Sequence, residues 1–145
     1  MPKKLRIKAP VTPALVINRA AIKGDRLVYL AVANKRMKHP FGSSRIVYIG
    51  TTKAGASRIA ASAAAKASQM LALHGVKELE FYVVTCGSRK RVKTWTKLER
   101  GLILTFRQQF GAIPNCNLQG KRMKWTDELN YFTERRLRDV IARFS

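Results

Sequence analysis

The sequence predicts an α+β fold in which helices flank a small three-stranded antiparallel sheet. Three segments rich in β-branched and aromatic residues are bounded by turn formers, as strands are. Two longer segments have a helix-favouring composition or an apolar period of 3.6 residues, and each ends at glycine. The 145 residues fit one domain, and a hydrophobic content of 46% is enough to bury a core.

Residues 26–33 form the first predicted strand and residues 45–49 the second, which ends at Gly50. The intervening residues 34–44 contain several bases and a Pro-Phe-Gly sequence, so they are expected to form a basic loop. A connection of this length favours antiparallel pairing of its two strands. Residues 79–85 form the third predicted strand.

An alanine-rich run over residues 55–74 predicts the first helix, because alanine has the highest helix propensity. Residues 95–110 carry apolar side chains on one face and predict the second helix. A third helix is expected to be capped by Thr126, since two acids follow it directly and arginines come later. The core is therefore strand, strand, helix, strand, helix, with an additional C-terminal helix.

Three parts are expected along the chain: a basic N-terminal arm over residues 1–25, a domain over 26–120 and a helical extension over 121–145. No stretch approaches the ~20 apolar residues of a membrane span. The N-terminus also lacks the apolar stretch and cleavage site of a secretory signal. Two cysteines, Cys86 and Cys116, are too few for a disulfide framework. A cytoplasmic, nucleoid-associated protein that is not secreted is expected.

The charge balance points to nucleic acid. Twenty-nine Lys and Arg against eight Asp and Glu give a net charge of +21, which is typical of a protein that binds phosphate backbones. A membrane surface is the competing partner for such charge, and no membrane partner is expected here. The bases predicted to contact phosphates are Lys35, Arg36, Lys38, Arg45, Lys53, Arg89, Lys90, Arg91 and Lys93.

Against this background, a small set of residues stands out. Tyr29 and Tyr48 lie on the two strands expected to pair, so pairing can bring the phenols to one face or end of the sheet. Arg58 follows ten residues after Tyr48. Glu99, on the second helix, is the only acid between Glu80 and Asp127. Asn117 completes the set in the segment after that helix.

These residues resemble the signature of the GIY-YIG nuclease family. The matching elements are Leu27-Val28-Tyr29, Tyr48-Ile49-Gly50-Thr51, Arg58, Glu99 and Asn117 within Pro114-Asn115-Cys116-Asn117. The resemblance covers about residues 26–120. It departs from the family at Leu27, where glycine is usual, and at Ser62, where many members carry histidine or tyrosine. His39 or a bridging water could replace that side chain.

The resemblance implies an endonuclease that hydrolyses phosphodiesters with one metal ion, with DNA favoured over RNA as the substrate. Arg58 would contact phosphate oxygens, and Glu99 would hold a single Mg²⁺ or Mn²⁺. One of the tyrosines would orient water or accept its proton; Tyr29 is slightly favoured, with Tyr48 as its positioning partner. Asn117 would tie the site together or contact phosphate. Sequence specificity is expected to be modest, or to come from a homodimer, a larger assembly or a partner.

Several alternatives stay open at this point. Thr96-Lys97-Leu98-Glu99 fits a capping box, which would give Glu99 a purely structural role. Asn115 is a close rival of Asn117, and either could be only a turn former. A non-catalytic nucleic-acid-binding protein that is nucleoid- or ribosome-associated could retain the same fold, and a basic scaffold for an acidic protein is a third reading. The intact Tyr, Tyr, Arg and Glu set favours the nuclease.

Overall fold

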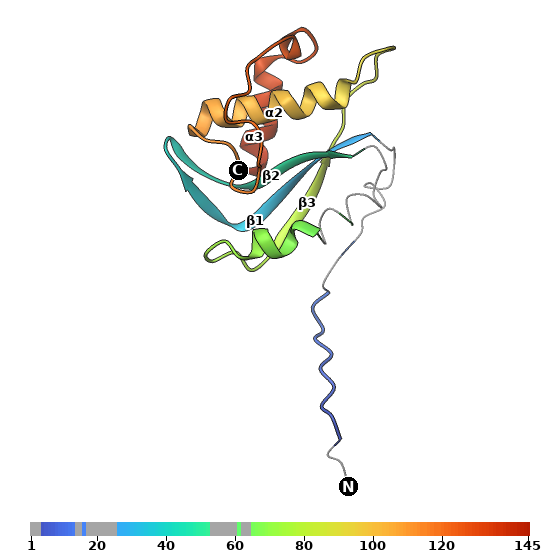
Figure 1. The fold of residues 1–145 in the computed structure, drawn as a ribbon, viewed down its shortest axis with the longest axis vertical. Coiled ribbons are helices and arrows are strands. Elements are labelled where there is room, and N and C mark those ends of the chain that lie inside the picture. The colour runs from blue at the N-terminus through green and yellow to red at the C-terminus, as the bar shows by residue number, and fades with distance from the viewer. Residues whose placement is uncertain (1–3, 14–15, 17–25, 53–60, 62–64) are drawn as a thin grey trace.

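The computed structural model describes residues 4–13, 16, 26–52, 61 and 65–145, and it confirms the predicted α+β class (Figure 1). Three strands form one antiparallel sheet in the order β2-β1-β3. The strands are β1 (Leu27–His39), β2 (Gly42–Thr52) and β3 (Leu79–Val84). The helices are α2 (Thr94–Phe110), the short 3₁₀ helix η2 (Glu128–Asn130) and α3 (Glu134–Phe144).

The alanine-rich segment is only partly described. Residues 65–71 are helical, as predicted, and a turn follows before Gly75. Gly75 has a φ of 79°, a left-handed conformation that glycine adopts without steric cost. Residues 53–60 and 62–64 lie outside the described residues, so the predicted start of this helix does as well.

The first two strands are longer than predicted, and the prediction of a basic loop over residues 34–44 is wrong. These residues continue β1 and β2 as a two-stranded ribbon with a tight turn between His39 and Gly42, which are paired. The register shifts between Val32 and Met37, so the ribbon is irregular where it leaves the core. The exposed bases misled the prediction. Lys35, Arg36 and Lys38 are exposed although the ribbon is paired, while its turn packs on the end of α2, where the Phe41 N–H donates to the Phe110 carbonyl at 3.0 Å.

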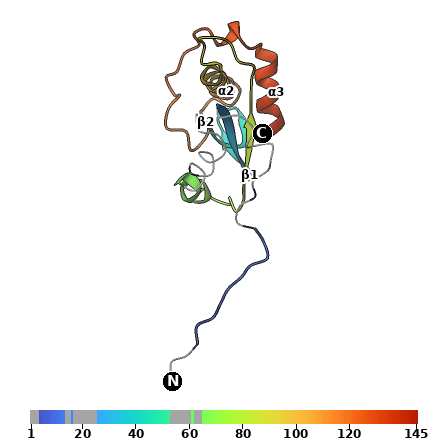
Figure 2. The same cartoon turned by 90° about the vertical axis from the view of Figure 1, so that its right-hand side faces the viewer.

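Both faces of the sheet are covered, which separates the residues of β1 into two sets. Val28 and Leu30 point towards α2 and α3, where they join Leu102, Phe106 and Leu137 in the larger core. Tyr29 and Ala31 point to the opposite face, which Met70 of the helical residues 65–71 helps to cover. Figure 1 shows the two helical layers on opposite sides of the sheet, and Figure 2 shows α3 beside α2.

The third helix starts later than predicted. Thr126 does not cap it; η2 follows Thr126 instead, and α3 begins at Glu134 with Thr133 as its N-cap. The Thr133 hydroxyl accepts a hydrogen bond from the backbone N–H of Arg136 at 3.3 Å. The sequence pattern failed here because Glu128 turns into the protein instead of lying at a solvated helix start.

Glu128 joins the C-terminal segment to α2. Its side chain is fully buried, and its Oε1 lies 2.6 Å from Arg100 Nε. Its Oε2 accepts the Thr126 N–H at 2.7 Å, while Arg100 Nη2 donates to the Lys124 carbonyl at 2.6 Å. Burial raises the pKa of this carboxyl, but the hydrogen bonds from Thr126 and Arg100 outweigh it and lower the pKa to about 2. The segment is therefore held by a charged contact that needs an ionised Glu128.

We expect Glu128→Gln to destabilise the protein near neutral pH by roughly 2 kcal/mol, because hydrogen bonds to a charged group are lost. Since the folded pKa lies below the ordinary value of 4.5, the stabilisation is present above pH 4.5 and is lost as the pH falls towards 2. Urea unfolding across this range measures both effects. Asp139→Asn, at an exposed position of α3, is the control. An unchanged slope of stability with pH in Glu128→Gln would contradict the prediction.

Candidate functional site

The hairpin of β1 and β2 brings Tyr29 and Tyr48 together. Tyr29 pairs with Gly50 across the ladder, and Tyr48 pairs with Ala31. The ring centroids are 5.8 Å apart, and the planes are tilted by 40°. A Cβ on Gly50 would lie 2.6 Å from Tyr48 Cε1 and 2.9 Å from the Tyr29 hydroxyl oxygen. The two rings therefore close over Gly50, and only glycine leaves them room.

The two phenols differ in their access to solvent. Tyr29 is 2% exposed and also packs against Phe81. Tyr48 is partly exposed, and Lys66 Nζ lies 4.0 Å from the centroid of its ring. Burial raises the pKa of Tyr48 above its ordinary 10.0, a hydrogen bond with Tyr29 lowers it, and the charge of Glu99 raises it. Because the pKa is raised overall, the Tyr48 phenol is protonated at neutral pH.

Glu99 reaches the same end of β2 from α2. Burial raises its pKa above 4.5, while a hydrogen bond with Thr51 and the charge of Arg100 act in the opposite direction. Thr51 directly follows Gly50, so the Glu99 carboxyl group contacts β2 one residue beyond the glycine over which the two tyrosines close. Helix α2 has Lys93 as its N-cap and begins at Thr94. The capping-box interpretation of Thr96 and Glu99 is therefore wrong, because Thr96 lies inside the helix.

Asn117 fastens the segment after α2 to the edge of the sheet. Its Oδ1 accepts the Ile49 N–H and its Nδ2 donates to the Ile49 carbonyl, both at 2.9 Å. The neighbouring Cys116 N–H donates to the Val47 carbonyl, also at 2.9 Å. Ile49 lies between Tyr48 and Gly50, so the amide acts directly on the strand that carries the site. This geometry favours Asn117 as the residue that ties the site together; Asn115 is exposed instead.

Four of the five predicted site residues, Tyr29, Tyr48, Glu99 and Asn117, thus meet around the end of β2. Arg58, together with Ser62 and the predicted phosphate contact Lys53, lies outside the described residues. His39 is no substitute for the side chain missing at Ser62. His39 is ten residues beyond Tyr29, which is about 30 Å along an extended strand. Its ring packs against that of Phe106, with 5.3 Å between the two ring centroids.

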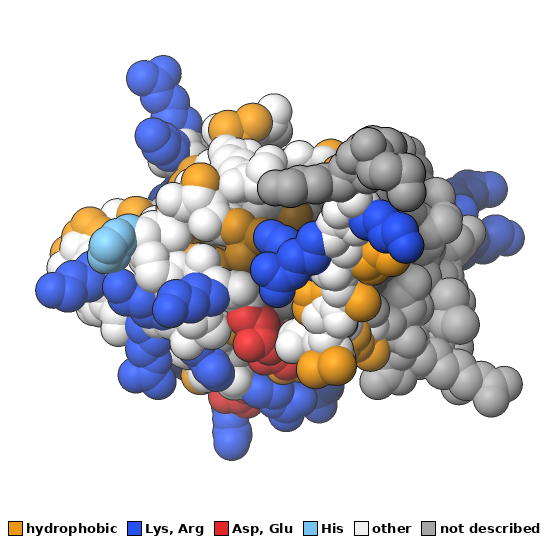
Figure 3. Space-filling model, turned by 90° about the horizontal axis from the view of Figure 1, so that it is seen from below, with side chains coloured by type: hydrophobic (Ala, Val, Ile, Leu, Met, Phe, Trp, Pro, Cys, Tyr) orange, Lys and Arg blue, Asp and Glu red, His pale blue; other side chains and the backbone are white. Residues whose placement is uncertain are grey.

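The predicted phosphate contacts are mostly exposed. Lys35, Arg36 and Lys38 lie on the ribbon of β1, and Arg89, Lys90 and Arg91 form a tight turn closed by the Val92 N–H and the Arg89 carbonyl at 3.1 Å. Lys93, directly before α2, is exposed as well. Arg45 differs, since its Nε is buried and has no hydrogen-bond partner among the described residues. Figure 3 shows basic side chains over much of one face, around a small acidic group.

The sequence did not predict two residues that contact the site, Thr51 and Lys66. Thr51 stands within the quoted motif, and its place next to Gly50 was a usable signal that it would meet the site. Lys66 belongs to an alanine-rich helix, where a lone lysine ordinarily indicates a solvated position. Its contact with the Tyr48 ring depends on how that helix crosses the sheet, and no local pattern reports this.

No family model, curated protein or solved structure matches this chain. The resemblance to GIY-YIG nucleases therefore rests on the sequence motifs alone. Within the described residues, no group of three or more His, Cys, Asp or Glu could hold a metal ion. No helix in the described part of the chain is both long enough and apolar enough to span a membrane.

We expect Gly50→Ala to displace the tyrosine rings and to destabilise the fold by about 1–3 kcal/mol, the usual cost of overpacking. The near-UV circular dichroism of the aromatic side chains and urea unfolding measure the two effects. Gly87→Ala is a matched control, because nothing lies within 4 Å of a Cβ at that position. Equal behaviour of the two variants would contradict the close approach over Gly50.

Proposed function

We propose that this protein is a metal-dependent endonuclease of the GIY-YIG type that hydrolyses DNA phosphodiesters. The observation that carries the proposal is the closure of Tyr29 and Tyr48 over Gly50 at the strand end where Glu99 arrives. A protein that only binds phosphates has no need for a carboxylate there, since the negative charge would repel the ligand. The net charge of +21 supports nucleic acid as the substrate.

The oxygen donors around Glu99 suit a hard divalent cation. The Glu99 carboxyl, the Thr51 hydroxyl and the phenols are all oxygen groups, which Mg²⁺ and Mn²⁺ prefer. Mg²⁺ commonly binds one or two carboxylates and completes its shell with water and phosphate oxygens, so a single carboxylate is sufficient. Glu99 would hold the ion. When bound, such an ion neutralises charge on the phosphate and stabilises the leaving oxygen.

The difference in burial between the tyrosines favours Tyr48 as the phenol that meets water, although the sequence slightly favoured Tyr29. Tyr29 is almost fully buried, whereas Tyr48 is partly exposed beside Lys66. Burial raises the pKa of Tyr48 more than the hydrogen bond with Tyr29 lowers it, so the phenol keeps its proton at neutral pH and can orient water through hydrogen bonds. We therefore assign orientation of the attacking water to Tyr48 and support of Tyr48 to Tyr29, with Arg58 as the predicted phosphate contact.

We expect Glu99→Gln to reduce Mg²⁺- or Mn²⁺-dependent cleavage by about 100-fold or more, because a transition-state charge contact is lost. Binding of the same DNA should be retained or slightly strengthened, because a negative charge is removed. Plasmid and oligonucleotide cleavage, with anisotropy for binding, measures both. Asp139→Asn, which removes an acid at an exposed position of α3, should cleave like the wild type. Arg58→Ala should also reduce cleavage.

A second candidate function, non-catalytic binding of nucleic acid, is favoured by the exposed basic turn at Arg89, Lys90 and Arg91. The same experiment separates the two functions. If the wild type binds DNA or RNA but cleaves neither with any divalent metal, the nuclease proposal is wrong and the binding function stands.

Thr51→Val should move the loss of cleavage at acidic pH to a higher pH. The Thr51 hydrogen bond lowers the pKa of Glu99, so its removal raises that pKa further above 4.5. Since protons compete with metal for the carboxylate, activity at limiting metal falls as the pH is lowered towards the raised pKa. Cleavage measured from neutral pH down to 4.5 at subsaturating Mg²⁺ tests this. Thr85→Val, at an exposed position, should leave the dependence of cleavage on pH unchanged. The same pH dependence in Thr51→Val and Thr85→Val would contradict the role of Thr51.

A further inference from the structure

A cavity of about 590 Å³ lies where the segment after α2 passes the edge of the sheet. Asn117 lines this cavity and also bonds to the backbone of Ile49, the residue of β2 between Tyr48 and Gly50. The residues that line it also include Arg107, Ile113, Pro114, Asn115, Leu118 and Lys121.

The lining of this cavity has two chemical parts. Ile113, Pro114 and Leu118 form an apolar part, and the Leu118 side chain is 82% exposed although it is large and hydrophobic. Arg107 and Lys121 supply two positive charges, and none of the described residues that line the cavity carries a carboxylate. A ligand that matches both parts has a flat apolar body and an anionic group. A nucleotide has this chemistry.

Arg107 is held in place for such a ligand. Its Nη1 donates to the carbonyls of Gly120 and Lys121, at 2.7 and 3.1 Å. A guanidinium has five N–H donors, so these two bonds leave donors for a phosphate. The two bonds also fix the orientation of the group, which reduces the entropy lost when an anion binds.

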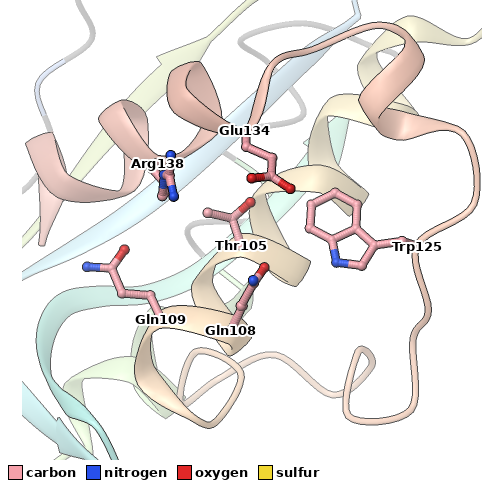
Figure 4. Close-up of a pocket in the computed structure, with 6 residues that line it drawn as sticks. All are labelled: Thr105, Gln108, Gln109, Trp125, Glu134 and Arg138. Carbon is pink, nitrogen blue, oxygen red and sulfur yellow. The ribbon is translucent and has the colours of Figure 1, made fainter.

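A second cavity provides a contrast (Figure 4). It measures about 220 Å³ and lies between α2 and α3, with Trp125 on one side. Glu134 and Arg138 both line it, so a carboxylate accompanies the positive charge of Arg138. This carboxylate disfavours a phosphate. The two cavities therefore differ in charge, although each has an exposed base at its edge.

Position links the larger cavity to the proposed cleavage site. Arg107 follows Glu99 by eight residues on α2, which is about 12 Å along the helix axis. Successive phosphates of one DNA strand are spaced by about 3.4 Å along the duplex axis, so this distance corresponds to a few nucleotides. We propose that the cavity binds one nucleotide of the substrate strand, a few steps from the cut, with its phosphate on Arg107 and Lys121 and its base against Leu118 and Pro114. This inference rests on the proposed function for its nucleic-acid substrate.

The test compares two charge reversals at exposed positions, Lys121→Glu in the proposed cavity and Arg138→Glu in the second cavity. Each changes the net charge equally, so long-range attraction to DNA is reduced alike. Anisotropy of a labelled single-stranded oligonucleotide, without divalent metal, measures affinity. We expect a loss of about tenfold for Lys121→Glu and about twofold for Arg138→Glu, since only the first removes a direct phosphate contact. Equal losses would overturn the proposal.

The base contact is tested with Leu118→Ala and an oligonucleotide that contains abasic sites. We expect this variant to bind the normal oligonucleotide several-fold more weakly and the abasic one like the wild type. Equal weakening on both would overturn the base contact, and circular dichroism checks that each variant is folded. Cleavage is not a readout here. Absence of cleavage would therefore defeat the nuclease proposal, while the affinity differences would still decide the cavity.

Discussion

The antiparallel pairing of Tyr29 with Gly50 is the constraint on which the site depends. Glycine at this position lets the two tyrosine rings approach each other over the backbone of β2, where any Cβ would lie within 3 Å of both rings. The same pairing fixes the alternation of β1, so that Tyr29 faces away from α2 while Val28 and Leu30 face the larger core. Core packing and the position of the phenols thus come from one strand register.

Two contacts then fix what surrounds this hairpin. Asn117 bonds to both backbone groups of Ile49, so the segment after α2 covers the edge of β2 and forms one side of the cavity at Arg107. Glu128, buried and paired with Arg100, holds the chain that leads to α3. In both contacts, a buried or half-buried polar side chain bonds to a residue far away in the sequence. Each contact therefore positions a whole segment of the chain and not only one side chain.

The sequence predicted the order and type of the elements because local signals were strong there. Turn residues bound the strands, and α2 has a continuous apolar face that ends at Gly111 in a left-handed conformation. The failures have physical causes. The ribbon over residues 34–44 carries exposed bases although its two strands are paired, so its charge resembles that of a loop. Thr126 resembles a cap, but Glu128, two residues later, is buried and paired with Arg100.

By itself, the sequence determined the charge that favours nucleic acid and the presence of two tyrosines on neighbouring strands. Tertiary structure decided which functional interpretation each residue supports. In the folded protein, Glu99 is hydrogen-bonded to Thr51 and takes no part in a capping box, and Asn117 is hydrogen-bonded to Ile49. Tyr29 is also buried more deeply than Tyr48. These outcomes depend on partners far away in the chain, 68 residues in the case of Asn117. No local pattern contains such a partner, because the contact exists only once the strands and helices have packed.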